Sequence, residues 1–169
     1  DFSGVEFQPN ARIRWTPAPG HTAWSCVSRA RPIPSRLDTD GGFITSVIPT
    51  SPLTFIRIEG NEDFDSESVV AAEAGYRGEL ASWFSVDVSA YHSWYERLRS
   101  VQPLEPVSEN GMTVQRFTFG NDASGRTWGG TIAANWRPAS RVLVRGSYTR
   151  LEMRGTPGPG APPGSLPGI

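Results

Sequence analysis

The most informative feature of the sequence is a strict alternation of apolar and polar side chains along several segments. In residues 128–136, WGGTIAANW, every second residue is apolar or small, and a tryptophan stands at each end of that row. Because side chains of a β-strand point alternately to its two faces, this stretch predicts a strand with one apolar and one polar face. A soluble core usually has its bulk in the middle of such a row, so the two terminal tryptophans indicate a different environment.

The same alternation predicts seven strands joined by two kinds of connection. The predicted strands are 10–16, 21–31, 53–59, 68–78, 84–99, 113–136 and 141–153, of which the sixth could break near 121–125. Short connections at 17–20, 78–83 and 137–140 alternate with long polar connections over about 32–66 and 100–125. This arrangement is uncommon in compact soluble domains and typical of outer-membrane β-barrels.

Ionisable side chains separate from apolar ones within these strands. All of them except His92 are assigned to the parity opposite to the apolar residues. In the second predicted strand, this assigns Trp24 and Cys26 to the apolar face and Arg29 and Arg31 to the polar face. Alternation alone leaves two alternatives, a soluble β-sandwich with its apolar face in a core and a membrane barrel with that face in lipid.

The positions of the tryptophans favour the membrane. Aromatic rings concentrate at membrane–water interfaces, where an amphipathic ring suits the boundary. From Phe84 to Trp94, ten residues of tilted strand span roughly 24 Å, close to the ~25 Å apolar band of such barrels. The predicted membrane-interface aromatics are Trp15, Trp24, Trp83, Trp94, Trp128 and Trp136.

Composition narrows the classes further. The net charge of −1 gives no basic balance for nucleic acid. The mean hydropathy is −0.35, and no apolar run is long enough for a spanning helix, which excludes a helical membrane protein but not a barrel. A single cysteine, Cys26, excludes an internal disulfide. We predict a partial barrel over 1–153 and a disordered Pro/Gly-rich tail over 154–169, and both ends suggest a piece of a larger protein.

Several segments together resemble the TonB-dependent outer-membrane receptors. The segments are SRARPIPSRLD (28–38), IEGNEDFDSESVVAAEAGYRGEL (58–80), FSVDVSAYHSWYERLRS (84–100) and FGNDASGRTWGGTIAANWRPAS (119–140). The order and spacing of these segments carry the resemblance, which runs over most of 7–153. The chain departs from the family pattern at 31–35, RPIPS, and at 61–67, NEDFDSE.

The resemblance implies an all-β fold of antiparallel up-and-down strands that form a segment of a transmembrane barrel of about 22 strands. It implies a location in the bacterial outer membrane and contact with its lipid. It also implies a non-enzymatic function, the active uptake of a nutrient such as an iron–siderophore complex, with TonB and a plug domain as partners in the full-length parent. The alternatives are a soluble secreted β-sandwich that binds a ligand and a passive porin-like barrel.

Candidate site residues are charged side chains expected to face the lumen, a ligand or the plug: Arg29, Arg31, Arg36, Glu73, Arg77, Asp87 and Arg145. The arginines could bind an anionic ligand, although pairing with lumen carboxylates is the favoured interpretation. The acidic run at 59–67 is interpreted as a solvated loop rather than a calcium site, because it lacks the spacing of an EF-hand. We predict no catalytic residues, no metal site and no cofactor.

Overall fold

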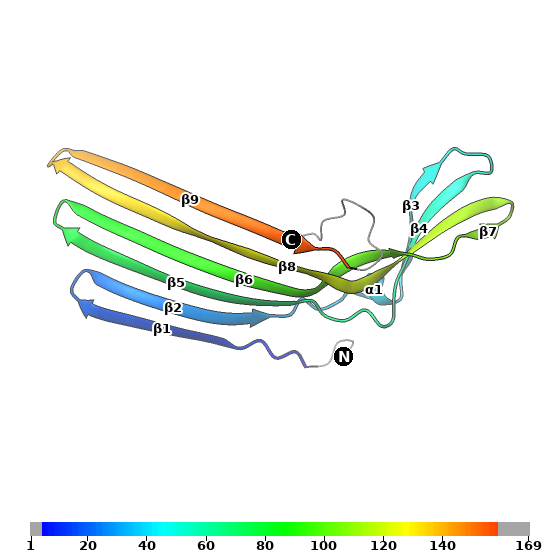
Figure 1. The fold of residues 1–169 in the computed structure, drawn as a ribbon, viewed down its shortest axis with the longest axis horizontal. Coiled ribbons are helices and arrows are strands. Elements are labelled where there is room, and N and C mark those ends of the chain that lie inside the picture. The colour runs from blue at the N-terminus through cyan, green and yellow to red at the C-terminus, as the bar shows by residue number, and fades with distance from the viewer. Residues whose placement is uncertain (1–4, 159–169) are drawn as a thin grey trace.

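Six long strands form a continuous antiparallel meander in the computed structural model, which describes residues 5–158 (Figure 1). They are β1 (Asn10–Ala18), β2 (His21–Ala30), β5 (Ser68–Ala81), β6 (Phe84–Pro103), β8 (Met112–Ala139) and β9 (Val142–Thr156). Their neighbours in the sheet follow the same order, from β1 to β9. The strands predicted near these positions are thus confirmed, and the strand β9 continues past the predicted boundary at 153.

Three two-residue turns close the meander at one end, which we call the turn end. Residues 19–20, 82–83 and 140–141 connect β1 to β2, β5 to β6 and β8 to β9. In the first of these turns Gly20 has a φ of +77°, a conformation that side chains with a Cβ rarely adopt. The predicted short connections therefore lie together at one end of the sheet, opposite the long connections (Figure 1).

The long connections contain more regular structure than the sequence predicts. The first holds the helix α1 (Arg36–Thr39) and the hairpin of β3 (Gly42–Ile48) with β4 (Thr54–Glu59), and the second holds β7 (Val107–Glu109). The Asp38 carboxylate accepts a hydrogen bond from the Ser35 backbone N–H at 2.8 Å, which closes the first turn of α1. Of these elements, only β4 was predicted. The predicted loop over 100–125 is instead the outer part of the β6–β8 hairpin.

The strand β8 belongs to two arrangements along its length. Its final part pairs with β6 on one edge and β9 on the other, whereas residues 113–118 pair in parallel with β4. Phe117 and Thr118 pair with β6 on one side and with β4 on the other. The strand β4 therefore lies along the same edge of β8 as β9, which pairs with a later part of β8. This parallel pair differs from the purely antiparallel sheet that was predicted. It arises because both segments run from the outer loops back toward the meander.

Residues 60–67 consequently cross the sheet. They leave β4 on the β9 side of β8 and reach β5, which lies beyond β6. On the way, Asn61 donates a hydrogen bond from Nδ2 to the carbonyl of Phe119 at 2.9 Å, and the backbone N–H of Asp65 donates to Asn121 Oδ1 at 2.8 Å. We call residues 60–67 the crossing segment.

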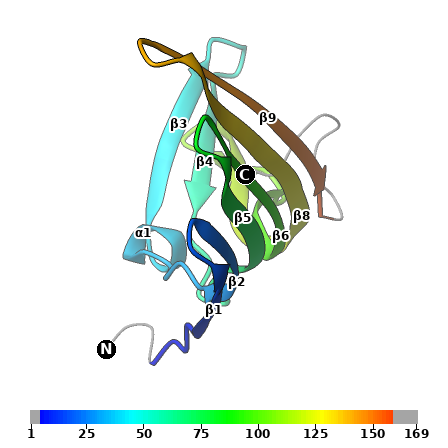
Figure 2. The same ribbon diagram turned by 90° about the vertical axis from the view of Figure 1, so that its left-hand side faces the viewer.

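The meander curls into part of a barrel (Figure 2). Among the described residues the sheet packs against no second sheet, which argues against the β-sandwich alternative. The all-β barrel-segment class is thus confirmed. Residues 159–169, the larger part of the predicted tail, lie outside the described range.

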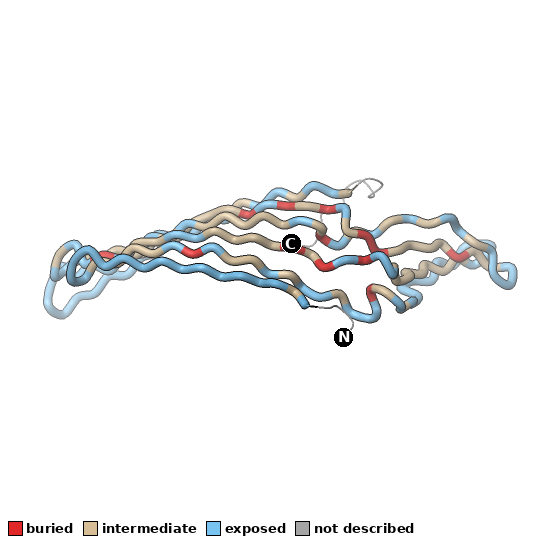
Figure 3. Tube along the Cα trace, turned by 90° about the horizontal axis from the view of Figure 1, so that it is seen from below, coloured by how far each residue is buried: buried red, intermediate tan, exposed pale blue. Residues whose placement is uncertain are grey.

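The molecule has two parts that differ in packing. The wall comprises residues 10–18, 21–30, 68–81, 84–95, 124–139 and 142–156, and the loop end comprises residues 31–67 and 96–123. The register of β6 and β8 shifts where the two parts meet. Buried positions gather near this junction and in the loop end (Figure 3). The buried apolar side chains are Cys26, Phe64, Leu98, Val114, Phe119 and Ala123, and of these only Cys26 belongs to the wall.

Candidate functional site

Strand pairing assigns the side chains of the wall to two faces, since directly paired residues share a face. One face carries the row Ala23, Tyr76, Val88, Ile132 and Tyr148. We call it the apolar face. The other carries the row Thr22, Arg77, Asp87, Ala133 and Ser147. We call it the polar face. The predicted alternation is therefore preserved across β5, β6, β8 and β9. The prediction that all ionisable residues of the strands except His92 lie opposite the apolar residues is wrong, because the pairing places five on the apolar face: Arg29, Glu96, Arg126, Arg150 and Glu152.

Hydrogen bonds and an ion pair link neighbouring strands on the polar face. Arg77 on β5 binds its direct partner Asp87 on β6, with 2.6 Å between Nε and Oδ2. On the same face, Asn135 Nδ2 donates to Ser85 Oγ at 3.2 Å, and Thr131 and Thr149 share a hydrogen bond of 3.0 Å between their hydroxyls. The predicted residues Glu73 and Arg145 also belong to this face.

The pairing reverses the predicted faces of Trp24, Cys26 and Arg29 on β2, and Cys26 pairs with Glu73 on the polar face. Trp24 pairs with Gly75 on the polar face, where a Cβ on Gly75 would lie 2.6 Å from the indole ring. Arg29 pairs with Val70 on the apolar face. The prediction took the largest apolar residue of β2 as the marker of its apolar face. The glycine on β5 instead provides room for the tryptophan ring on the polar side.

The other predicted interface aromatics occupy both ends of the apolar face. Trp15 and Trp136 lie near the turn end, and Trp94 and Trp128 lie near the loop end. Trp83 is part of the β5–β6 turn, with its ring centroid 5.9 Å from that of Phe84. Trp24 is thus the one predicted girdle residue that the pairing places on the opposite face.

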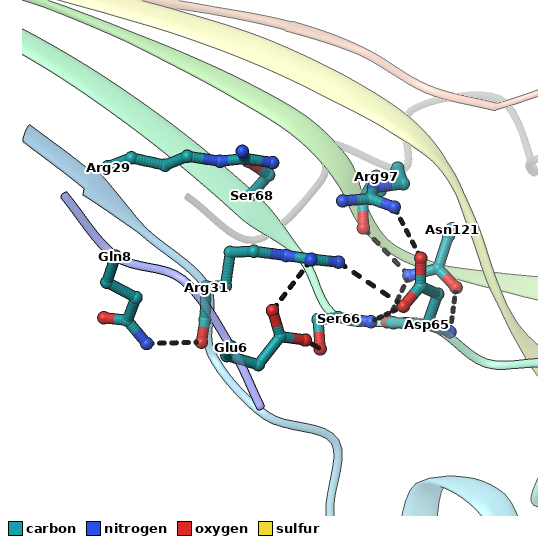
Figure 4. Close-up of polar contacts among 9 residues, drawn as sticks. All are labelled: Glu6, Gln8, Arg29, Arg31, Asp65, Ser66, Ser68, Arg97 and Asn121. Carbon is teal, nitrogen blue, oxygen red and sulfur yellow. Dashed lines mark hydrogen bonds and ion pairs between the residues drawn. The ribbon is translucent and has the colours of Figure 1, made fainter. Parts of the chain in front are cut away.

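Where the wall meets the loop end, four charged side chains form a network (Figure 4). Arg31 follows β2 and forms ion pairs with Glu6 at 2.7 Å and with Asp65 at 3.6 Å. Asp65 also pairs with Arg97 at 2.5 Å. The network thus ties the chain before β1, the end of β2, the crossing segment and β6 to one another.

Asn121 extends the network to β8. Its amide Nδ2 donates to the backbone carbonyls of Asp65 and Arg97, both at 2.9 Å. Arg97 has a φ of +56°, in the left-handed region, and lies where the register of β6 shifts. The side chain of Asn121 thus satisfies one backbone carbonyl of the crossing segment and one of the irregular part of β6.

Beside this network, an aromatic cluster anchors the crossing segment. The rings of Phe64 and Phe119 have centroids 6.1 Å apart, and the guanidinium of Arg99 lies 5.5 Å and 5.1 Å from the two centroids. Arg99 also forms an ion pair of 2.9 Å with the buried Asp38 of α1. The predicted Arg36 is the first residue of α1.

A second set of charges joins β4 to β8 and β7. Arg116 binds Glu59 through two contacts of 2.7 Å and 2.5 Å, and Arg57 binds Glu109 through two contacts of 3.1 Å and 2.9 Å. The hydrogen bonds from Arg116, more than its charge, lower the pKa of Glu59 below its ordinary value of 4.5. The hydrogen bond to Glu109 raises the pKa of Arg57.

The acidic run at 59–67 was predicted to be a solvated loop, but several of its carboxylates bind other groups of the protein. Glu59 and Asp65 bind arginines, and Glu67 accepts the backbone N–H of Arg99 at 2.8 Å. Within residues 5–158, no group of three or more His, Cys, Asp or Glu side chains is arranged to hold a metal ion. Over the same range, no helix is long and apolar enough to cross a membrane.

Sequence reasoning missed Glu6, Phe64, Arg97 and Asn121. One signal could have identified Phe64, because a large apolar residue between Asp63 and Asp65 suggests burial within an otherwise solvated run. The partners of Asp65 carry no comparable signal. They come together because the crossing segment runs over β8 and β6, and the periodicity of the sequence does not predict that path.

Comparison with known proteins agrees with this architecture. The chain matches the family model described as TonB dependent receptor-like, beta-barrel, over residues 1–168. The chain therefore belongs to the family of TonB-dependent receptor β-barrels. No curated protein sequence matches it.

Solved structures of siderophore receptors share the fold at low sequence identity. The siderophore receptor PirA of Acinetobacter baumannii has a TM-score of 0.68 and 14% identity, with 89% of this chain and 23% of PirA covered. A variant of the ferric enterobactin receptor PfeA of Pseudomonas aeruginosa, in complex with enterobactin, has a TM-score of 0.72 and 12% identity, with 90% of this chain and 23% of PfeA covered.

A third relative is the iron transporter FrpB of Neisseria meningitidis, with a TM-score of 0.57 and 13% identity. The alignment covers 88% of this chain and 20% of FrpB. The chain thus spans between about a fifth and a quarter of the length of these three receptors.

Proposed function

We propose that this chain forms part of the wall and cell-surface loops of a receptor in a bacterial outer membrane, which takes up a scarce nutrient with energy supplied through TonB. The observation that carries the proposal is the two-faced wall. Its apolar face ends in tryptophans near both ends, whereas its polar face carries cross-strand contacts such as that of Arg77 with Asp87. An apolar face bounded by aromatic residues suits a bilayer, and a charged face suits a hydrated lumen.

Within this proposal, the polar face would contact the lumen and a plug domain. Glu73, Arg77, Asp87 and Arg145 would be the contact residues. Arg31 and Arg36, at the loop end, would lie nearer the cell surface. Arg29 leaves the group of lumen candidates, because its pairing with Val70 places it on the apolar face.

An iron–siderophore complex is the nutrient class that we propose. The solved receptors with this fold include two named siderophore receptors and an iron transporter. The loop end supplies arginines from several elements, and guanidinium groups suit the carboxylate and catecholate oxygens of such chelators.

The proposal is tested by uptake in cells that carry the full-length parent gene. Deletion should abolish accumulation of one radiolabelled ferric siderophore from a panel, and plasmid expression should restore it. Uptake should stop in cells without TonB. Uptake that continues without TonB would identify a passive porin-like barrel, and extraction of the protein from envelopes without detergent would contradict membrane insertion.

A further inference from the structure

Four arginines lie on the apolar face. They cannot belong to a charge network in the lumen, because the lumen is assigned to the polar face. The row at the loop end of this face contains Arg29, Val70, Trp94, Arg126 and Arg154, paired in that order across five strands. Arg150 lies on the same face of β9, two rows nearer the turn end. We call Arg29, Arg126, Arg150 and Arg154 the basic band.

The basic band is confined to one end of its face. Between it and the turn end, the described wall has no Asp, Glu, Lys or Arg on the apolar face. The rows there hold residues such as Ile13, Val88 and Ile132. The face therefore changes from apolar to basic at the level of Trp94 and Trp128, the aromatic residues of its loop-end half.

The acidic side chains of this face do not balance the band. Glu96 and Glu152 are the carboxylates on it among the described residues, and Arg150 binds Glu152. Arg29 donates from Nε to Ser68 Oγ at 3.4 Å, and the guanidinium of Arg154 lies 5.1 Å from the centre of the Trp128 ring. Over residues 5–158, Arg29, Arg126 and Arg154 have no ion pair with a carboxylate.

Two of these arginines are direct neighbours. Arg126 on β8 pairs with Arg154 on β9, and both are exposed. Like charges directly opposite on adjacent strands destabilise a sheet. An anion with several oxygens would remove this repulsion by bridging the two guanidinium groups. A groove of about 360 Å³, lined by both arginines, by Trp94 and by the single carboxylate of Glu96, offers room for such a group.

Next to this groove, the face provides a place for an apolar chain. A shallow hollow of about 550 Å³ lies over Ala90 and Gly130 and is bordered by Trp128 and by the ion pair of Arg150 with Glu152. Small residues there leave space between larger ones, so a hydrocarbon chain could lie along the strands below a headgroup held by the band. A basic rim above an apolar hollow is complementary to an anionic lipid.

We infer that the basic band docks the phosphorylated headgroup of a glycolipid from the outer leaflet, with one of its acyl chains in the hollow over Ala90 and Gly130. This inference rests on the proposed function, because the apolar face meets that leaflet only if the wall spans an outer membrane with its loop end outward. The proposed contact lies on the lipid side of the wall and not on the uptake path.

The test uses the full-length receptor purified in detergent. The probes are a diphosphorylated glycolipid, its enzymatically dephosphorylated form and inorganic phosphate. Thermal unfolding and native mass spectrometry would be measured for the wild type, for Arg126→Gln/Arg154→Gln and for Arg137→Gln/Arg141→Gln. The last variant removes the same charge at the turn end, from β8 and from the turn that precedes β9.

We expect the diphosphorylated glycolipid to raise the Tm of the wild type and of the turn-end variant. Because two charge-assisted contacts are lost, its affinity for the Arg126→Gln/Arg154→Gln variant should fall about tenfold or more. A single Arg29→Gln variant should show a smaller loss. Heat-modifiable migration would establish that each variant is folded.

Three results would overturn the inference: equal binding by both double variants, equal binding of the dephosphorylated lipid, or an equal rise in Tm with phosphate alone. Uptake assays separate this failure from that of the proposed function. TonB-dependent uptake without preferential glycolipid binding would overturn the docking surface alone. A parent that neither requires detergent nor supports uptake would overturn the proposed function.

Discussion

The wall and the loop end are stabilised in different ways. The loop end contains five of the six buried apolar side chains of the described residues, and it joins distant segments through arginine–carboxylate pairs. The wall leaves Ile13, Ile132 and Tyr148 48–70% exposed. Its strands are joined by backbone ladders, and the ring contacts of its apolar face, such as that of His92 with Trp94, lie within the single sheet. The loop end can therefore pack by itself, whereas the wall requires surroundings that the chain does not supply.

The largest expected difference between the two ends is accessibility in cells. An epitope tag after Thr50, between β3 and β4, should bind antibody on intact cells that express the full-length parent. A tag after Ser140, in the β8–β9 turn, should bind only after permeabilisation, because the turn end would face the periplasm. Labelling in the reverse order would invert the proposed orientation.

The aromatic cluster of the loop end should be sensitive to truncation. Phe119→Ala removes a side chain that is 6% exposed and packs on Phe64, so it should cost about 3–5 kcal/mol of local stability. Hydrogen exchange in the full-length protein should show faster exchange in the crossing segment than in the wall. Val101→Ala is the control, since Val101 pairs directly with Phe119 but is 38% exposed. Equal effects of the two substitutions would contradict the conclusion that Phe119 is a core residue of the loop end.

In the wall, the two faces should respond in opposite ways to one charge. Ile132→Arg places a guanidinium on the apolar face and should destabilise the protein in lipid vesicles by about 2–4 kcal/mol. Thr131→Arg, one residue away on the polar face, should change stability by less than about 1 kcal/mol. Urea unfolding of both variants of the full-length parent gives the comparison. Similar losses would show that the faces do not meet different solvents.

Lipid contact can be mapped directly along the same strand. Spin labels at positions 130, 132 and 134 should be relaxed by a lipid-soluble quencher, and labels at 129, 131 and 133 should not. If labels at the even positions were shielded from both lipid and water, the apolar face would be a protein core and the membrane interpretation would be wrong.

The smallest expected effect concerns pH at the loop end. Hydrogen bonds from Arg116 lower the pKa of Glu59, so the folded state binds this proton more weakly than the unfolded state does. The stabilisation is complete above the ordinary carboxyl pKa and is lost as the pH falls through the lower folded value. Amides of β4 should exchange faster in acid, after correction for the intrinsic pH dependence of exchange. Glu59→Gln should remove this part of the acid response, and an unchanged response would contradict the role of Glu59.

Periodicity predicts the wall well because most of its strands have one apolar face and one polar face. The alternation of Val86, Val88 and Ala90 with Ser85, Asp87 and Ser89 directly encodes the two faces of β6. In β2 the same rule fails, because Trp24 fits over Gly75 and the neighbouring residues of β2 are too small to mark a face. The face on which Trp24 lies is therefore determined by the residues of the partner strand β5.

The candidate site is less predictable for a different reason. Arg31 and Asp65 could be identified as charged residues of loops, but their contact depends on where the crossing segment runs. The partner Asn121 lies 56 residues after Asp65 in the chain. Local sequence does not specify such a contact, and the acidic run was therefore interpreted as solvated.

The crossing segment also constrains the order in which the protein can assemble. It lies over a pair of strands, β6 and β8, which must already be beside each other before it can settle on them. The pairing of Thr54 with Thr113 closes a long loop, whereas each wall strand from β5 onward pairs with the next one along the chain. Long closures cost more chain entropy and form more slowly. In a pulsed hydrogen-exchange experiment during folding of the full-length protein, amides of β6 should thus become protected before those of β4, and the loop end should form last.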